Sequence, residues 1–382
     1  MFHTLTEEAA TNRLYIDLAL IKENINRIRE HVGRTKDGNP VKVVGVIKAV
    51  GYGTHLTSLG KRVETLGLDM LGVSSPDEGA QLRKSGVTLP MLCLLCPPNE
   101  AEKAVRHNLI IALYSKDLAD ALAGTGASVH LKINTGMGRL GVKPEEAVDL
   151  ARCAREKGLT VSGVMTHLSV ADDPSMDKDT RKQFERFDAT IALLKSAGFD
   201  NLISHASATS GTLRYKELHN NPSYYPYDMV RIGIGLYGIT PSPAVQMACP
   251  LVFALSLRSR IVSIRQCLSG ERLGYGGTFS VPEGGLRVGI IPFGYHDGIP
   301  WRKQPLAFGV MILGKWAKVV GRVSMDSVIV DLSGIPECVV GDEVVLWGLE
   351  RSIDDFAEEV GSMSYELLTR LGPRVQRVFL GE

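Results

Sequence analysis

The stretch Val41-Lys-Val-Val-Gly-Val-Ile-Lys-Ala-Val-Gly-Tyr-Gly53 decides the fold. It begins with β-branched residues that are apolar on both faces, which is typical of a parallel strand covered by helices. After the Gly-Tyr-Gly turn, apolar residues recur at helical spacing: Leu56, Leu59, Val63 and Leu66. Lys48 stands where the strand meets the turn. Burial there would disfavour the charged form and make the amine a usable nucleophile, whereas the alternative is a lysine that only extends to the rim of the sheet.

The alternation of strand and helix continues to about residue 248. Helical patterns such as Glu145–Lys157 and Arg181–Ala197 separate most of the strands. The predicted strands are Val43–Val50, Leu68–Ser74, Leu89–Leu95, Leu109–Tyr114, Ser128–Asn134, Thr160–His167, Asn201–Ala206 and Met229–Tyr237. Eight strands alternating with helices are typical of a TIM-type (β/α)8 barrel. We therefore predict such a barrel over residues 1–248, with a doubly wound open sheet as the competing fold. The short strand near residues 13–17 lies outside this count, and we expect it to pair with a second domain.

The alternation of predicted strands and helices ends near residue 249. Strand patterns with Gly-rich turns follow, and helical patterns are scarce until Ile353–Glu359 and Tyr365–Leu371. The predicted strands are Leu251–Ile264, Leu286–Pro292, Gly309–Val320, Val328–Leu332 and Glu343–Trp347. Residues 249–382 are thus interpreted as a second, mainly β domain.

Composition narrows the class of protein. The net charge of +1 over 382 residues argues against a nucleic-acid footprint. No apolar run approaches the roughly 20 residues of a membrane span, and the N-terminal residues show no signal-peptide pattern. The six cysteines are scattered, and Cys93-Leu-Leu-Cys96 lies in an apolar strand without a second pair. We interpret it as a reduced core pair and expect a reducing compartment, the cytoplasm.

Chemistry-bearing residues gather at the predicted C-terminal ends of the barrel strands, where such barrels hold their active sites. No cluster has metal-ligand spacing, and no Gly-rich phosphate loop of a known type is present. Taken singly, Arg139 could be a surface charge, His167 a core histidine and Arg231 a structural ion-pair partner. Together they indicate an active site. The residues at these ends are Lys48, Tyr52, Lys132, Arg139, His167, Thr209, Arg231, Gly233 and Ile234.

Six motifs, in order along nearly the whole chain, resemble those of the alanine racemase family of fold-type III pyridoxal-phosphate enzymes. In the barrel they are Val46-Ile-Lys-Ala-Val-Gly-Tyr-Gly53, Lys132-Ile-Asn-Thr-Gly-Met-Gly-Arg-Leu-Gly141 and Met229-Val-Arg-Ile-Gly-Ile-Gly-Leu-Tyr-Gly238. In the second domain they are Leu273-Gly-Tyr-Gly-Gly-Thr278, Phe293-Gly-Tyr-His-Asp-Gly298 and Gly321-Arg-Val-Ser-Met-Asp326.

The resemblance implies a role for each matching residue. Lys48 would bind pyridoxal 5'-phosphate covalently and act as one acid/base. Arg231 would face the pyridine nitrogen, and Arg139 would lie by the cofactor phenolate and the substrate carboxylate. His167 would order Tyr275 and Arg231. The phosphate would be held by Tyr52, Thr209 and the backbone N–H groups of Gly233 and Ile234. Lys132 matches a lysine that is carbamylated in some members.

The resemblance further implies that the second domain completes the barrel site of a partner subunit in a head-to-tail homodimer. Tyr275 would be the second acid/base, on the opposite face of the substrate. Met325 would lie near the substrate carboxylate, and Tyr295 and Asp326 would line the entrance. The implied activity is interconversion of L- and D-alanine, which supplies D-alanine for peptidoglycan.

Elementary chemistry supports these roles. Racemisation removes a proton from one face of Cα and returns one to the other, so two groups on opposite faces suit it. A tyrosine ordinarily titrates near pH 10 and needs cationic neighbours to act near neutrality. His167 and Arg231 are the candidates. An arginine at the pyridine nitrogen only donates, which leaves that nitrogen unprotonated and weakens the ring as an electron sink.

The sequence departs from the family pattern at four places. Thr54-His55 replaces the usual His-Gly after Tyr52-Gly53. Val50-Gly51 replaces the usual Asn-Ala after the lysine motif. Ala208-Thr209 replaces Asn-Ser, so Ser207 or Ser210 could hold the phosphate instead of Thr209. Pro373 stands where a phosphate-contacting tyrosine is expected, and proline offers no hydroxyl.

Three other functions are considered. A fold-type III amino-acid decarboxylase shares this plan but would place an acidic residue at the pyridine nitrogen. A single-barrel pyridoxal-phosphate carrier would lack the second domain. A racemase of another small amino acid such as serine is hardest to separate, because a methyl and a hydroxymethyl group differ little.

Overall fold

The computed structural model describes residues 10–219, 223–303 and 307–381. The N-terminal residues inspected for a signal peptide lie outside the described residues. The chain divides into two compact units. Of the described residues, those within 20–51 and 55–252 form the barrel unit, and those within 10–19, 52–54 and 253–381 form the second unit. Among the described helices, none combines the length and the apolar character needed to cross a membrane.

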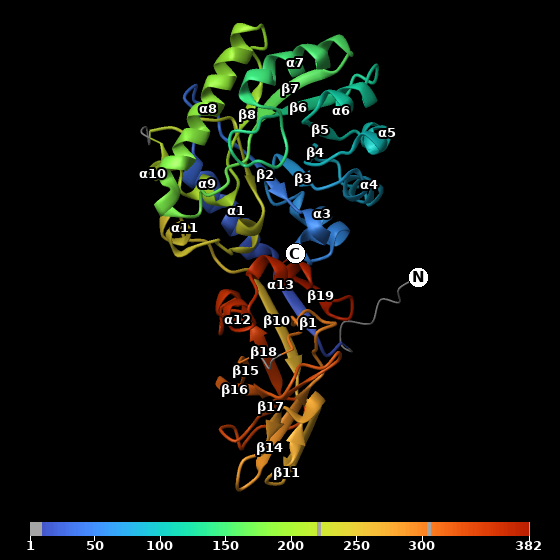
Figure 1. Cartoon of the computed structure of the whole chain (residues 1–382), viewed down its shortest axis with the longest axis vertical. Helices are drawn as coiled ribbons and strands as arrows, with labels where there is room; N and C mark the ends of the chain where they lie inside the picture. The colour runs from blue at the N-terminus through green and yellow to red at the C-terminus, as the bar shows by residue number, and fades with distance from the viewer. Residues whose placement is uncertain (1–9, 220–222, 304–306, 382) are drawn as a thin grey trace. The chain divides into compact units, whose positions relative to one another are not determined.

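Eight parallel strands form the sheet of the barrel unit, as the sequence predicted, and Figure 1 shows helices around them. Their order is β8-β7-β6-β5-β4-β3-β2-β9. Backbone hydrogen bonds from Asp228 N to Ser204 O (3.0 Å) and from Arg231 N to Ser207 O (3.1 Å) link β8 and β9. The strands are β2 (Lys42–Val46), β3 (Met70–Val73), β4 (Met91–Cys93), β5 (Ile110–Leu113), β6 (Ser128–Lys132), β7 (Thr160–Met165), β8 (Ile203–His205) and β9 (Met229–Ile232).

Helices connect these strands. They are α1 (Leu18–Val32), α2 (Lys48–Tyr52), α3 (Leu56–Val63), α4 (Pro76–Lys84), α5 (Ala101–Arg106), α6 (Lys116–Ala121), α7 (Ala147–Glu156), α8 (Asp177–Ser196), α9 (Thr209–Leu213), α10 (Tyr215–Leu218) and α11 (Pro243–Ala248). Short 3-10 turns add η1 (Pro98–Glu100), η2 (Pro144–Glu146), η3 (Pro174–Met176) and η4 (Ile234–Tyr237). Side-chain caps begin several helices, such as Ser75 on α4 and Ser115 on α6.

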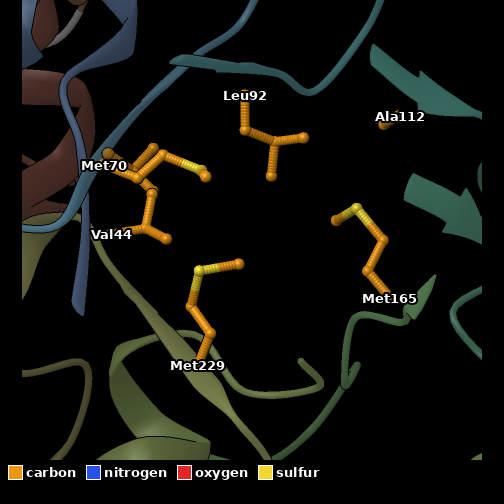
Figure 2. Packing of buried hydrophobic residues seen from close by; sticks show 7 residues of the cluster. Val44, Met70, Leu92, Ala112, Met165 and Met229 are labelled. Carbon is orange, nitrogen blue, oxygen red and sulfur yellow. The ribbon is translucent and has the colours of Figure 1, made fainter. Parts of the chain in front are cut away.

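Buried apolar side chains from the barrel strands form a packed cluster inside the barrel. Figure 2 shows that the labelled side chains come from different strands and point toward a common centre. Burying such a side chain stabilises the fold by about 1.5–3 kcal/mol, so the inward face of each strand specifies its place in the barrel. The cluster consists of Val44, Val46, Met70, Leu92, Ala112, Met165 and Met229.

The second unit contains a nine-stranded sheet of order β11-β14-β17-β16-β15-β18-β10-β1-β19. The first strand, β1 (Arg13–Asp17), pairs with β10 and β19. The other strands are β10 (Leu255–Arg260), β11 (Ser263–Cys267), β14 (Leu286–Ile291), β15 (Gly309–Ile312), β16 (Lys315–Val320), β17 (Val328–Asp331), β18 (Glu343–Trp347) and β19 (Gln376–Leu380). A separate pair, β12 (Arg272–Leu273) and β13 (Phe279–Ser280), flanks η5 (Tyr275–Gly277), and the helices are α12 (Ile353–Glu359) and α13 (Ser364–Thr369).

Most predicted strands are longer than the observed ones, and four of them show clear reasons for the difference. The strand predicted over residues 43–50 ends at Val46, and the one over residues 229–237 ends at Ile232, because each chain segment then turns to form the rim. The segments 251–264 and 309–320 each divide into two strands. In the second, Leu313 and Gly314 have φ of 50° and 73°, values expected for a tight hairpin turn. Leucine is unusual at the first position of such a turn, so the sequence pattern did not reveal the turn.

Candidate active site

Lys48 lies at the start of a left-handed turn directly after the first barrel strand. Ala49, Val50 and Gly51 have φ/ψ near 53/56°, 59/36° and 68/37°. Such backbone costs roughly 1–2 kcal/mol per non-glycine residue. It is held by Gly51 N donating to Ile47 O (2.9 Å) and by Tyr237 Oη donating to Gly51 O (2.6 Å). The turn therefore fixes where the lysine leaves the strand.

The environment of Lys48 favours its neutral amine. Burial lowers the pKa of Lys48, and the positive charge of Arg139 lowers it further. The carboxylate of Glu78 acts in the opposite direction. Desolvation thus makes the side chain a better nucleophile, which is the property expected from the sequence.

Lys132 and Arg139 come from β6 and the loop that follows it. Lys132 is buried, and its pKa is lowered well below the ordinary value by burial and then by the charges of Arg231 and Arg139. Asn134 shapes the loop, because its side-chain oxygen accepts from Gly136 N (3.2 Å) and Gly138 N (3.0 Å). Arg139 is exposed at the end of this loop.

Arg231 is buried on β9 and makes five hydrogen-bond contacts with acceptors. Each acceptor is a carbonyl oxygen or an imidazole nitrogen. Burial lowers the pKa of Arg231 to about 10, so the guanidinium stays charged at neutral pH. The acceptors are Thr166 O (2.7 Å), Ala206 O (2.9 Å), His205 O (3.1 Å), His205 Nδ1 (2.8 Å) and His167 Nδ1 (3.4 Å).

Behind Arg231 lies a histidine pair that the sequence analysis did not select. His205 Nε2 is 2.7 Å from His130 Nδ1, and both rings are buried. Burial lowers the pKa of His130 to about 4 and that of His205 well below 6.5, so both are neutral at pH 7. Since arginine only donates, His205 Nδ1 accepts from it and Nε2–H donates to His130. The sequence signal was the alternation of His130 with Lys132 on one face of β6.

His167 follows β7 and is also neutral. Burial, followed by the charges of Arg231, Lys132, Arg139 and Lys48, lowers the pKa of His167 to about 2. The sequence analysis named His167 as a cationic neighbour for a catalytic tyrosine, and that part of the interpretation is wrong. Of the two candidates, Arg231 carries the charge.

The proposed phosphate-binding residues lie around the start of α9 and the end of β9. Thr209 and Ile234 are buried, and Gly235 N donates to Thr209 Oγ1 at 3.4 Å. Ser207, the first alternative to Thr209, is fully buried, while Ser210 is half-buried in α9. The structure thus brings Thr209, Gly233 and Ile234 together in one place.

Tyr52 belongs to the second unit together with Gly53 and Thr54. Its ring lies 6.3 Å, centroid to centroid, from Tyr365 of α13. The backbone of Leu368 in α13 leaves no room for a Cβ at Gly53, which explains the glycine. Pro373 is exposed, and the sequence analysis did not name Tyr365 as a neighbour of Tyr52. The pattern Met363-Ser-Tyr-Glu at the start of a helix was the available signal.

The remaining site candidates line a pocket of about 590 Å³ on the second unit. Tyr275 begins η5 and is 71% exposed, and Met325 is 51% exposed. Asp326 pairs with Arg374 (2.6 Å), which also holds the buried Asp297 (3.0 Å). The pocket residues are Tyr275, Tyr295, Trp301, Arg322, Val323, Met325 and Asp326.

The donor set of the barrel rim fits pyridoxal phosphate. A partly desolvated lysine can bind an aldehyde covalently, and a guanidinium surrounded by acceptors can donate to a neutral pyridine nitrogen. Among the described residues, no group of histidine, cysteine or carboxylate side chains could hold a metal ion.

Comparisons with known proteins agree with this geometry. A family model described as the N-terminal domain of alanine racemase matches residues 16–241, and one described as its C-terminal domain matches residues 254–379. The alanine racemase of Desulforamulus reducens is 35% identical over 379 residues, which cover 96% of this chain and 98% of that protein. Among solved structures, alanine racemase from Clostridium difficile 630 matches with a TM-score of 0.87 and 30% identity, covering 98% of this chain and 97% of the other. The enzyme from Streptomyces coelicolor A3(2) matches with a TM-score of 0.86 and 29% identity, over 97% of this chain and 98% of the other.

Proposed function

Because the chain belongs to the alanine racemase family, we propose that it interconverts L-alanine and D-alanine with bound pyridoxal 5'-phosphate. The observation that carries this proposal is the pairing, in one barrel unit, of a lysine with a lowered pKa and a buried arginine that meets only acceptors. The product D-alanine would serve peptidoglycan synthesis. The free cysteines support action in the cytoplasm.

When bound, the cofactor accepts the electron pair that remains at the substrate Cα after the proton leaves. Lys48 would hold the cofactor covalently until the substrate amine displaces it, and its freed amine would then move the proton on one face of Cα, while Tyr275 would move the proton on the other. Arg231 would donate to the pyridine nitrogen. Arg139 and Met325 would lie beside the substrate carboxylate. His167, as a neutral ring whose Nδ1 faces Arg231, orders Tyr275 and Arg231.

The phosphate is assigned to Tyr52, Thr209 and the backbone N–H groups of Gly233 and Ile234. The neighbouring Tyr365 adds a second phenol beside Tyr52.

The working unit in this proposal is a head-to-tail homodimer in which each active site uses residues of both subunits. The exposure of Tyr275 and Met325 supports it, because a catalytic tyrosine on an open surface needs a partner to exclude water from it. Tyr295 and Asp326 line the entrance, and the Arg374 ion pair holds Asp326 there.

The test is hydrogen exchange during turnover. Purified protein with added pyridoxal phosphate is incubated with L-alanine in D2O, and Cα deuterium and D-alanine are measured. We expect deuterium in both enantiomers of alanine. The rate of D-alanine formation should fall about 10²–10⁴-fold in Lys48→Ala and in Tyr275→Phe. Tyr15→Phe, a tyrosine of β1, is the matched control and should keep full activity.

The alternatives give different results in the same assay. Exchange with L-serine but not L-alanine would keep the mechanism and change the substrate. Release of carbon dioxide from a basic amino acid would indicate the decarboxylase, against which the acceptors around Arg231 already argue. Cofactor absorbance without exchange on any amino acid would refute the proposal and favour a carrier.

A further inference from the structure

Glu78 makes two short backbone contacts at the rim of the barrel. It lies in the first turn of α4, where its own N–H donates to the cap residue Ser75 (3.4 Å). Its side chain then extends away from the helix. Oε1 accepts from Ala49 N and Oε2 accepts from Ser74 N, both at 2.7 Å.

These two contacts join the ends of neighbouring strands. Ser74 directly follows β3, and Ala49 is the first left-handed residue after Lys48. The Ala49 N–H cannot donate to a sheet ladder in such a turn, and because Ala49 is exposed, Glu78 gives this N–H a fixed acceptor in place of mobile water. The Glu78 carboxylate therefore stabilises the turn that orients Lys48, and it links this turn to the end of β3.

Glu78 also carries charge close to Lys48. The ionisable groups that act on or respond to Lys48 are Arg139 from the loop after β6, His167 after β7 and Glu78 from α4. His167 is neutral at pH 7 and Arg139 is positive, so Glu78 supplies the opposing negative charge.

We propose that Glu78 is a positioning residue for Lys48, which fixes the left-handed turn through Ala49 and balances the charge of Arg139 on the amine. The role rests on the proposed function, because Lys48 is there the cofactor-binding lysine. The motif Ser75-Pro-Asp-Glu78 also resembles a capping box, but its glutamate is directed to two strand ends.

Two substitutions separate charge from geometry. Glu78→Gln removes the negative charge and keeps one acceptor oxygen, while Glu78→Asp keeps the charge but is one methylene too short to reach both donors. The control is Glu64→Gln. Glu64 likewise accepts from two backbone groups, Thr88 N (2.7 Å) and Leu89 N (2.9 Å), before β4 and thus at the opposite end of the strands.

The measurement is the rate at which the cofactor-free protein takes up pyridoxal phosphate between pH 6 and pH 10, followed by absorbance and by borohydride trapping at Lys48. For Glu78→Gln we expect the midpoint of the pH profile to move to lower pH, because the group that favours the charged amine is gone. For Glu78→Asp we expect the midpoint of the uptake profile to stay near that of the wild type. Its kcat for alanine racemisation, measured separately, should be about tenfold lower, because the amine is misplaced. Glu64→Gln should leave both unchanged.

A Glu78→Gln profile identical to that of the wild type, or an equal shift in Glu64→Gln, would overturn the proposal. A Glu78→Asp variant with wild-type kcat would overturn the geometric part. Failure of the proposed function would give a different result. Either borohydride would trap no cofactor at Lys48 of the wild type, or the Lys48→Ala variant would trap as much cofactor as the wild type.

Discussion

At the scale of single residues, the site is a collection of basic groups, most of which have lowered pKa values. Lys132 and Lys48 have lowered pKa values, and the histidines around Arg231 are neutral. Burial is the largest cause in each case, since desolvation penalises the charged form. Arg231 keeps its charge because its intrinsic pKa is so high that burial cannot remove it.

The lowered pKa of Lys132 leads to a prediction. An uncharged amine is the form that reacts with carbon dioxide, and the resulting negative carbamate would face Arg139 and Arg231, which favour it. We expect protein in ¹³C-bicarbonate to show a carbamate carbon by NMR that is absent from Lys132→Ala, with racemisation roughly tenfold lower in that variant. Lys157→Ala, an exchange of the surface lysine that pairs with Asp120, should keep the signal. A wild-type spectrum without this signal would contradict the prediction.

At the scale of elements, the left-handed turn after β2 stores strain next to Lys48. Val50 is β-branched, 57% exposed and held at φ 59°. Its side chain gains nothing from packing there, whereas asparagine tolerates this conformation. We expect Val50→Asn to raise the free energy of unfolding by about 1 kcal/mol, measured by denaturant unfolding.

Val339→Asn is the control for this change. Val339 is 58% exposed and is not among the residues with positive φ. We expect no gain in stability there. An equal gain at both positions would show that lower surface hydrophobicity, and not relief of backbone strain, is the cause.

At the scale of the whole molecule, the two residues proposed as acid/bases belong to different compact units. Lys48 lies in the barrel unit and Tyr275 in the second unit. If each active site takes them from different subunits, two inactive variants can restore one another. Mixing Lys48→Ala with Tyr275→Phe under conditions of subunit exchange should yield about a quarter of wild-type activity, because half of the dimers then contain one intact site. No recovery, with exchange confirmed by mass labelling, would place both residues of a site in one chain.

The sequence by itself determined the barrel strands, the second domain and the residues at the strand ends. Each strand of the barrel is a local apolar run, so its position follows from neighbouring residues alone. The site residues then followed from the rule that barrel sites lie at one end of the strands. The confirmed family resemblance added their proposed roles.

Only the tertiary structure decided the charge state and support of these residues. The neutrality of His167, the contact of Glu78 with Ala49 and the position of Tyr365 beside Tyr52 depend on burial and on residues far apart in the chain. The parallel pairing of β1 with β19 joins the two ends of the chain in the same way. Local patterns cannot report such features, because desolvation and hydrogen-bond partners exist only once distant segments have packed together.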